Sequence, residues 1–303
     1  MSDRRLRSPA LDVSLSIGGT AIHLVSDDHG LAPDAHGPLR QFFTDPCRAD
    51  VEIRARWTDT PAAPGGDVLF DAGSWQLARL GGQFVFTFRS DTGDAAPYKT
   101  ARFNSTFTVG DVDVYRPHFD RQPLVVVDPL EYPLDELLMM HVLSQGKGVE
   151  IHGCGLIDAG GRAYVFAGQS GAGKSTLASL WMDDPGVKLL SDERVVLRTD
   201  RSPIVVYGTP WHGDAVLVSP LSADLAGVFF LHHAATHAVA PTGGLRAVAQ
   251  LLACSFLPFH NAEAVGRVMA IVEQATRAVP CYDLWFAPDP SVRAFLKRQM
   301  DGT

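Results

Sequence analysis

Residues 168–176 read Gly168-Gln169-Ser170-Gly171-Ala172-Gly173-Lys174-Ser175-Thr176, which fits the pattern G-x-x-x-x-G-K-[ST] of a phosphate-binding loop. Glycines in this pattern allow the backbone to point several N–H groups at one anion. The lysine lies near the β and γ phosphates of a nucleotide, and the hydroxyl of the following residue binds Mg²⁺. The stretch therefore predicts a nucleotide triphosphate site. We expect its contacts to come from Gly168, Ser170, Gly171, Ala172, Gly173, Lys174, Ser175 and Thr176.

The segments on either side of this loop have the character that such a loop requires. Residues 162–167 read Arg-Ala-Tyr-Val-Phe-Ala, a short apolar run that is typical of a buried strand. Residues 176–181 begin a helical pattern, and the positive end of that helix dipole would face the phosphates. This context favours a phosphate-binding loop over a chance match in a turn rich in glycine and serine.

An acidic pair ends the next apolar run. Residues 187–193 read Val-Lys-Leu-Leu-Ser-Asp-Glu, so that Asp192 and Glu193 follow an expected strand. A hydrophobic strand that ends in Asp is where a phosphate-loop protein places its second metal-binding group. Asp192 can bind Mg²⁺ directly or through water, and it can also accept a proton. We therefore expect a metal site made of Ser175, Asp192 and Glu193, in preference to a plain turn at a strand end.

Composition limits the classes of protein to which this loop can belong. The chain has 303 residues, 46% of them hydrophobic and 20% charged, which is ordinary for a globular protein of about two domains. A net charge of −8 without any Lys/Arg block argues against nucleic acid or an anionic membrane as a partner. The basic segment Met1–Arg7 is not followed by an apolar run, and no stretch is long enough to predict a membrane span. The scattered cysteines (Cys47, Cys154, Cys254 and Cys281) predict reduced thiols and a cytoplasmic protein.

Two regimes of patterning divide the chain. Before residue 126, short alternating runs such as Leu11–Ile17, Val51–Ala55 and Gln83–Phe88 are separated by clusters of glycine, proline and aspartate, for example residues 61–67. Residues 133–143 then form an amphipathic helical pattern that begins with proline and acids. We therefore expect a β-rich N-terminal domain over residues 1–128 and a nucleotide-binding domain over residues 129–303.

The second domain resembles the catalytic domain of HPr kinase/phosphorylase, which is itself similar in architecture to phosphoenolpyruvate carboxykinase. The shared order is a His-Gly dipeptide on a strand (His152-Gly153), a second strand, the phosphate loop, a short helix, and a strand that ends in an acidic pair. The chain is closer still to HPr-kinase-related proteins of bacterial genomes, with which it shares the patterns at residues 133–138, 149–153 and 208–213. Some of these proteins are encoded beside genes for modified peptides, including lasso peptides, where a related kinase phosphorylates a peptide serine.

The resemblance implies roles for individual residues. Asp192 matches the first acid of the pair, which acts as the general base toward an attacking serine hydroxyl. Glu193 matches the second acid, which is Asp in HPr kinases. His152 matches a histidine near the phosphates that orients the acid or the phosphoryl group; a buried histidine bonded to backbone is the alternative interpretation. HPr kinases assemble as hexamers, which leaves a homo-oligomer open.

Two departures separate this chain from HPr kinases. The phosphate loop ends in Lys174-Ser175-Thr176, whereas HPr kinases usually have Lys-Ser-Glu. Residues 208–213, Gly-Thr-Pro-Trp-His-Gly, replace the arginine-bearing signature that is linked to dephosphorylation and to docking of HPr. Both departures argue against phosphorylase activity and against HPr as the substrate.

Three further features have two interpretations each. Trp211 and His212 offer a stacking surface and a donor near phosphate, or Trp211 fills the core. The histidines of residues 231–237 suggest a metal site, but a polar loop at a strand end is favoured. Arg246 is either a cationic phosphate clamp or a solvated surface residue.

Together these patterns predict an α/β fold: a phosphate-loop domain of the HPr kinase/phosphoenolpyruvate carboxykinase type with a mixed sheet, preceded by the β-rich domain. The expected activity is an ATP- and Mg²⁺-dependent kinase that transfers the γ-phosphoryl group to a hydroxyl, serine of a peptide or protein. Lys174, Asp192 and His152 are the expected catalytic residues. A nucleotide-binding regulatory protein without phosphoryl transfer and a kinase of small molecules remain the alternatives.

Overall fold

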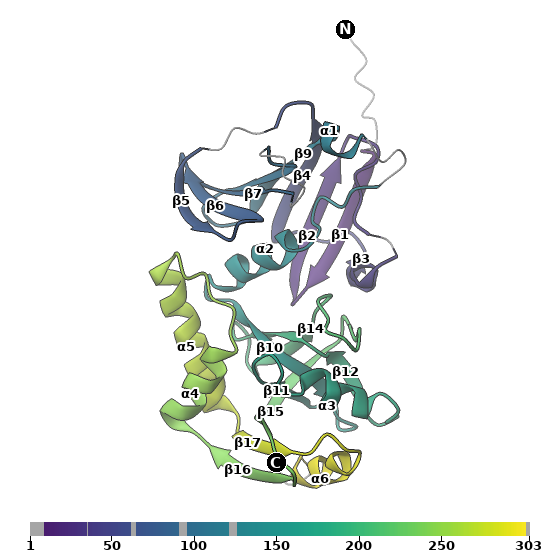
Figure 1. The fold of residues 1–303 in the computed structure, drawn as a ribbon, viewed down its shortest axis with the longest axis vertical. Coiled ribbons are helices and arrows are strands. Elements are labelled where there is room, and N and C mark those ends of the chain that lie inside the picture. Colours follow the sequence, from purple (N-terminus) through teal and green to yellow (C-terminus); the bar gives the residue numbers. More distant parts are fainter. Residues whose placement is uncertain (1–8, 35, 62–64, 91–95, 121–125, 301–303) are drawn as a thin grey trace. The chain divides into compact units, whose positions relative to one another are not determined.

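The chain folds into two compact units (Figure 1). The computed structural model describes residues 9–34, 36–61, 65–90, 96–120 and 126–300. Unit 1 comprises residues 1–16 and 20–142, and unit 2 comprises residues 17–19 and 143–303. The sequence-based boundary at residue 128 assigned the helix at residues 133–143 to the second domain, whereas nearly all of that helix belongs to unit 1. The basic segment Met1–Arg7 and residues 62–64 of the expected turn lie outside the described residues.

Unit 1 is built on one nine-stranded sheet in the order β3-β1-β2-β4-β9-β8-β7-β6-β5. Its strands are β1 (Leu11–Ile17), β2 (Thr20–Ser26), β3 (Phe43–Thr44), β4 (Val51–Thr58), β5 (Asp67–Asp71), β6 (Trp75–Leu80), β7 (Gln83–Phe88), β8 (Lys99–Phe103) and β9 (Val109–Tyr115). Its helices are the short 3₁₀ helix η1 (Pro38–Phe42), α1 (Arg116–Phe119) and α2 (Leu134–Leu143).

Alternation of side chains explains these strands. In β4, Val51, Ile53 and Ala55 are buried, while Glu52 and Arg54 between them are exposed. Successive side chains of a strand point to opposite faces, so this period of two places one apolar face against the core. The three alternating runs named from the sequence lie within β1, β4 and β7.

Unit 2 contains the phosphate-binding loop. Its strands are β10 (Gly148–Ile157), β11 (Ala163–Ala167), β12 (Lys188–Ser191), β13 (Arg194–Arg198), β14 (Val205–Gly208), β15 (Ser222–His233), β16 (Ala238–Thr242) and β17 (Cys281–Phe286). Its helices are α3 (Lys174–Trp181), α4 (Gly244–Ala253), α5 (Ala262–Ala278) and α6 (Ser291–Met300).

Five of these strands form a closed ring. Antiparallel pairing joins β11 to β10, β10 to β13, β13 to β14 and β14 to β15. Parallel pairing of β11 with β15 then closes the ring. β17 and β16 extend the sheet from β15, and β12 pairs with β10. The ring places the strand before the phosphate loop, β11, directly between β10 and β15.

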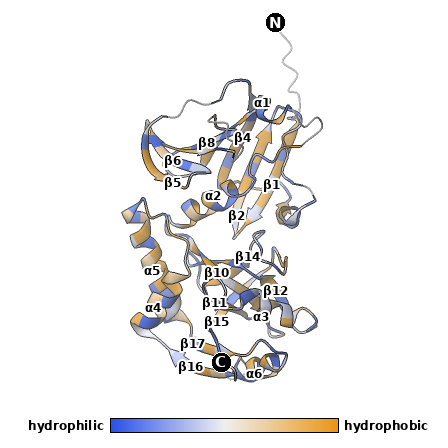
Figure 2. Ribbon diagram, in the orientation of Figure 1, coloured by the Kyte–Doolittle hydropathy of each residue, from blue (hydrophilic) through white to orange (hydrophobic). Residues whose placement is uncertain are grey.

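Two apolar clusters stabilise unit 2. One combines alternate residues of the ring strands, such as Val165 and Val228, with residues of α4 and α5. The other lies on the opposite face of β11 and β15, where Phe166 and Phe229 pack with α3 and α6. Figure 2 shows both orange and blue along α4 and α5, as expected for helices with one apolar face.

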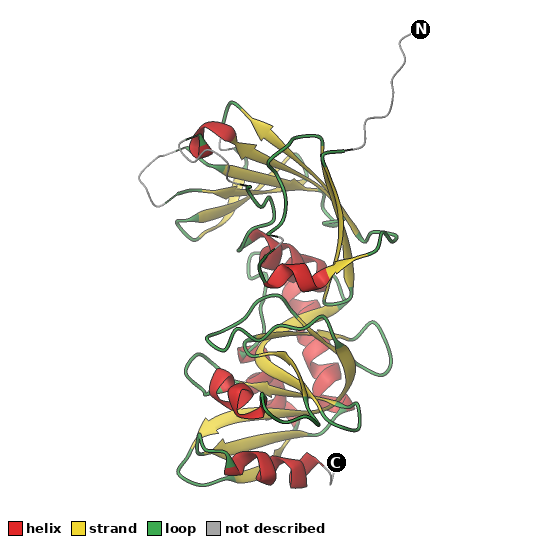
Figure 3. Ribbon diagram, turned by 90° about the vertical axis from the view of Figure 1, so that its right-hand side faces the viewer, coloured by secondary structure: helices red, strands yellow, loops and turns green. Residues whose placement is uncertain are grey.

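The α/β classification expected from the sequence is wrong. The structure contains 39% strand and 23% helix, and strands predominate in Figure 3. In an α/β domain, helices connect neighbouring parallel strands. Here β10 and β11 are consecutive and antiparallel, and α3 leads to β12, which is antiparallel to β10. The strands therefore close into a barrel and do not form an open mixed sheet between layers of helices.

Two other expectations concern the chain as a whole. All four cysteines are free, and Cys154, Cys254 and Cys281 are buried while Cys47 is exposed. Across the described parts of the chain, no helix is both long enough and apolar enough to cross a membrane.

Candidate functional site

The phosphate-binding loop joins the carboxyl end of β11 to the first turn of α3. Gly171 and Gly173 have φ angles of +80° and +93°, a region that side-chain-bearing residues rarely adopt. A Cβ atom on Gly168 would lie 2.7 Å from the Cβ of Ala172, so this turn also requires glycine. The backbone thus requires both glycines of the pattern, Gly168 and Gly173, and also Gly171, which the pattern leaves open.

Lys174 is the first residue of α3, and its side chain points back across the loop. Its Nζ donates hydrogen bonds to the carbonyl oxygens of Gly168 and Gln169, each at 3.0 Å. The residue is buried, and burial lowers the pKa of its ammonium group. Lys174 therefore already lies over the loop, where the pattern requires its charge.

A pocket of about 380 Å³ opens above the loop. It is lined by His152, Ser170, Gly171, Gly173, Lys174, Ser175, Thr176, Glu193, Gly213, Asp214 and His233. These residues come from the loop, β10, the β12–β13 turn, the segment after Trp211 and the end of β15. The pocket thus brings most of the residues expected from the sequence together with two that were not expected, Asp214 and His233.

Asp192 lies directly after β12 and is fully buried. Its carboxylate accepts three backbone hydrogen bonds, from the N–H groups of Gly213 at 3.1 Å, Ala215 at 3.0 Å and Leu217 at 3.2 Å. Such bonds stabilise a buried carboxylate. Asp192 therefore holds residues 213–217 beside the phosphate-binding loop.

Because Gly213 has no side chain, three side-chain oxygen atoms approach its backbone closely. A Cβ atom there would lie 2.8 Å from Ser175 Oγ, 2.9 Å from Asp192 Oδ2 and 3.4 Å from Glu193 Oε2. A hydroxyl and two carboxylates facing one space fit a hard cation such as Mg²⁺, which binds few protein ligands and keeps several waters. No group of three His, Cys, Asp or Glu side chains suited to a metal occurs among the residues that the structure describes. A cation held by these three oxygen atoms would take its remaining ligands from water and a bound phosphate.

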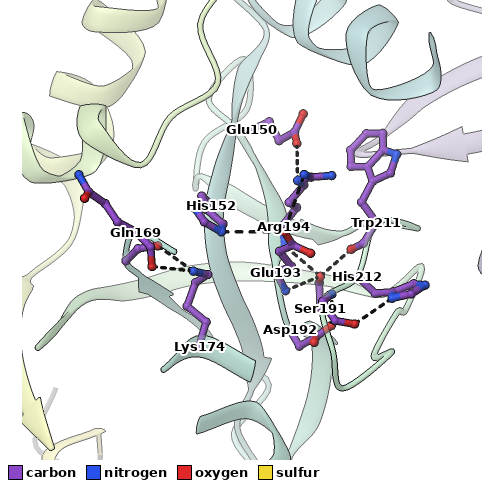
Figure 4. A network of polar contacts seen from close by, with 12 residues as sticks. Glu150, His152, Gln169, Lys174, Ser191, Asp192, Glu193, Arg194, Trp211 and His212 are labelled. Atoms are coloured by element: carbon purple, nitrogen blue, oxygen red, sulfur yellow. Dashed lines mark hydrogen bonds and ion pairs between the residues drawn. The ribbon is translucent and has the colours of Figure 1, made fainter. Parts of the chain in front are cut away.

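Glu193 and His152 face each other at the edge of the pocket (Figure 4). Glu193 Oε1 lies 4.0 Å from His152 Nε2. Burial, together with the charges of Lys174 and Arg194, lowers the pKa of His152 to about 4. His152 is therefore neutral at pH 7 and forms no ion pair with the carboxylate of Glu193.

His233 contacts the phosphate-binding loop from the end of β15. Its Nε2 lies 2.5 Å from the carbonyl oxygen of Gly171, and its ring stacks on Phe286 at 6.3 Å. In the sequence, His233 stands out only as one of the histidines of residues 231–237 and as the end of an apolar run. Asp214 carried no comparable signal.

The structure also decides between the alternatives at Trp211 and Arg246. Trp211 is 5% exposed, so its ring fills the interior. The carbonyl oxygen of Trp211 accepts a hydrogen bond from Ser191 Oγ at 3.1 Å, and His212 Nδ1 lies 2.9 Å from the carbonyl oxygen of Gly213. The exposed Arg246 pairs with Asp283 at 3.0 Å and does not line the pocket.

The histidines between residues 231 and 237 make separate contacts. His232 Nε2 lies 2.7 Å from Asp283 Oδ1, and His237 Nε2 lies 2.7 Å from Ser291 Oγ. His233 contacts the phosphate-binding loop. Within the described residues they form no metal site.

Sequence comparisons assign no family. No protein-family model matches the chain, and no curated protein matches it significantly. Function is therefore argued below from the pocket itself.

Proposed function

We propose that this protein is an ATP- and Mg²⁺-dependent kinase that transfers the γ-phosphoryl group to a hydroxyl group, serine of a peptide or protein. One observation carries the proposal: Ser175 Oγ, Asp192 Oδ2 and Glu193 Oε2 converge on Gly213, beside the phosphate-binding loop and its pocket. Phosphoryl transfer needs positioning and neutralisation of charge more than covalent help from the protein. The order of His152-Gly153, loop and acidic pair supports a relationship to HPr-kinase-related proteins, and such a kinase would use cytoplasmic ATP.

The residues of the pocket divide the work of binding. The glycine-rich backbone would hold the phosphates, and Lys174 would exchange its two carbonyl partners for phosphate oxygens. Ser175 and Asp192 would hold Mg²⁺, which supplies charge neutralisation when it is bound.

In the transfer step, the acceptor oxygen forms a bond to the γ phosphorus while the bond between that phosphorus and the β–γ bridging oxygen breaks, and ADP leaves. The hydroxyl proton passes to a carboxylate. The geometry favours Glu193 for this role, because Glu193 lines the pocket while the carboxylate of Asp192 is buried and accepts three backbone hydrogen bonds. This assignment gives Asp192 the structural and metal-binding role.

The test uses the purified full chain with γ-labelled ATP, Mg²⁺ and a library of serine-containing peptides. We expect Lys174→Ala to reduce transfer at least about 100-fold, whereas Lys188→Ala, an exposed lysine on β12, leaves transfer unchanged. Glu193→Gln should lower kcat at least about 100-fold and leave ATP binding intact. Glu273→Gln on α5 is its matched control.

Three results would contradict the proposal. Unchanged transfer in Lys174→Ala would remove the phosphate-binding loop from the reaction. Tight ATP binding without transfer to any acceptor would indicate a regulatory nucleotide-binding protein. Label found only on small alcohols or sugars would indicate a small-molecule kinase.

A further inference from the structure

Arg194 is a charged residue that the proposed reaction does not use; it does not line the pocket but contacts Glu193, which does. It is the first residue of β13, and it lies opposite His152 in the pairing of β10 with β13. Its Nη2 lies 3.8 Å from Glu193 Oε1, as Figure 4 shows. Its side chain is 15% exposed, so this guanidinium group is largely removed from water.

Two groups outside the pocket hold Arg194. Its Nε lies 3.8 Å from Oε1 of Glu150, whose side chain is fully buried on β10. Its guanidinium carbon also lies 5.2 Å from the centre of the Phe256 ring. The N–H of Phe256 donates to the carbonyl oxygen of Glu150 at 3.0 Å, so both partners are tied to the same strand.

The two acidic side chains beside Arg194 differ in their exposure to solvent. Glu150 is enclosed, so that the charge of Arg194 offsets part of the cost of burying its carboxylate. The side chain of Glu193 is 27% exposed at the pocket. Arg194 is therefore anchored on its Glu150 side and contacts the carboxylate that faces the phosphate end of the pocket.

We propose that Arg194 is a positioning residue: anchored by Glu150 and Phe256, it holds the carboxylate of Glu193 in place for the acceptor hydroxyl. The inference rests on the proposed function, because it assigns to Glu193 the proton of that hydroxyl. A base that is already restrained in its reactive position loses less conformational entropy when the acceptor binds. The restraint should therefore raise kcat and leave the KM for ATP unchanged.

The test compares Arg194→Met, Glu193→Gln and the double variant in the same transfer assay. Arg194→Met should lower kcat about tenfold or more, while the KM for ATP stays within about twofold. Arg194→Lys should restore part of the loss, because lysine keeps the charge without the planar fork. The double variant should be no slower than Glu193→Gln alone. Arg246→Met, which removes an arginine paired with a buried carboxylate away from the pocket, is the matched control and should leave kcat unchanged.

Independent losses that multiply in the double variant would overturn the proposal, as would a raised KM for ATP with unchanged kcat. If Arg194→Met does not fold, the double variant Glu150→Gln/Arg194→Met, which removes both charges, takes the place of Arg194→Met in each comparison.

A binding measurement separates this proposal from the proposed function. If the wild-type chain transfers phosphate to no acceptor, the proposed function has failed, and Arg194 is judged by the affinity for ADP with aluminium fluoride, which mimics the phosphoryl group in transfer. Wild-type protein should prefer this complex over ADP alone about tenfold or more, and Arg194→Met should lose that preference. Equal preference in the two proteins overturns the proposal.

Discussion

At the scale of single residues, Gly213 is a position where the candidate site tolerates little change. A Cβ atom there would lie within 3 Å of the hydroxyl of Ser175 and of the carboxylate of Asp192. Gly213→Ala should therefore weaken binding of Mg²⁺–ATP at least about tenfold, because its methyl group must displace one of these groups. Calorimetric titration measures the effect. Gly243→Ala, at an exposed glycine whose added Cβ would meet nothing within 4 Å, is the control. Equal affinities in both variants would contradict the assignment of the oxygen atoms around Gly213 to a cation.

His152 permits a test by titration. We expect its ring in the metal-free protein to titrate near pH 4, because burial and the charges of Lys174 and Arg194 oppose its protonation. NMR of the imidazole, assigned with His152→Asn, measures this pKa directly. A value near 6.5 would show that the ring is solvated and free to become charged at mild acidity.

The same shift has a consequence for stability. The folded-state pKa lies below the unfolded value, so the unfolded chain binds the proton more readily, and stability falls as the pH drops from about 6.5 to about 4. The full difference corresponds to roughly 3 kcal/mol. Thermal unfolding across this pH range should show a smaller loss for His152→Asn than for the wild-type chain. An identical pH dependence would contradict the prediction.

At the scale of elements, helix α5 contains a glycine whose replacement should make the protein more stable. Gly266 lies in its interior, is exposed, and an added Cβ would meet nothing within 4 Å. Gly266→Ala should raise the free energy of unfolding by about 0.5–1 kcal/mol, since alanine loses less backbone entropy in a helix. Denaturant unfolding measures this gain. Gly171→Ala has equally open surroundings, but its φ of +80° should make that variant less stable than the wild type. A gain at Gly171, or none at Gly266, would refute the reasoning.

The elements of the site differ in how far the sequence revealed them. The phosphate-binding loop was recognisable because each of its positions meets a local requirement of backbone or charge. Asp192 and Glu193 were recognisable because they end an apolar run. His233 was not, because pairing of β11 with β15 brings it to the loop, and the pattern of a single strand carries no information on its neighbours. The same absence of pairing information explains why the α/β classification was wrong while the expected strands at β10, β11 and β12 were present.

At the scale of the whole molecule, charge makes a prediction about metal dependence. The chain carries a net charge of −8, and the pocket lining contains Glu193 and Asp214 but one lysine, Lys174. An ATP molecule without a cation would bring its own negative charge toward these acids. Removal of divalent cations with EDTA should therefore weaken ATP binding at least about tenfold. Asp214→Asn should reduce this dependence, whereas Asp224→Asn, at an exposed position of β15, should not. ATP binding that is indifferent to EDTA would refute the prediction.

The closed ring of unit 2 has one consequence for how such a chain can vary. Because β11 pairs with both β10 and β15, the offsets between neighbouring strands must agree around the whole circuit. A residue inserted into β10 or β13 would turn the side chains beyond it to the opposite face, and the ring has no free edge at which to absorb the change. An insertion that precedes His152 or Arg194 in its strand would then turn that side chain from the face of the site to the opposite face of the sheet. We therefore expect chains that keep this site to differ in length at their connections, and to keep the same number of residues in the five strands of the ring.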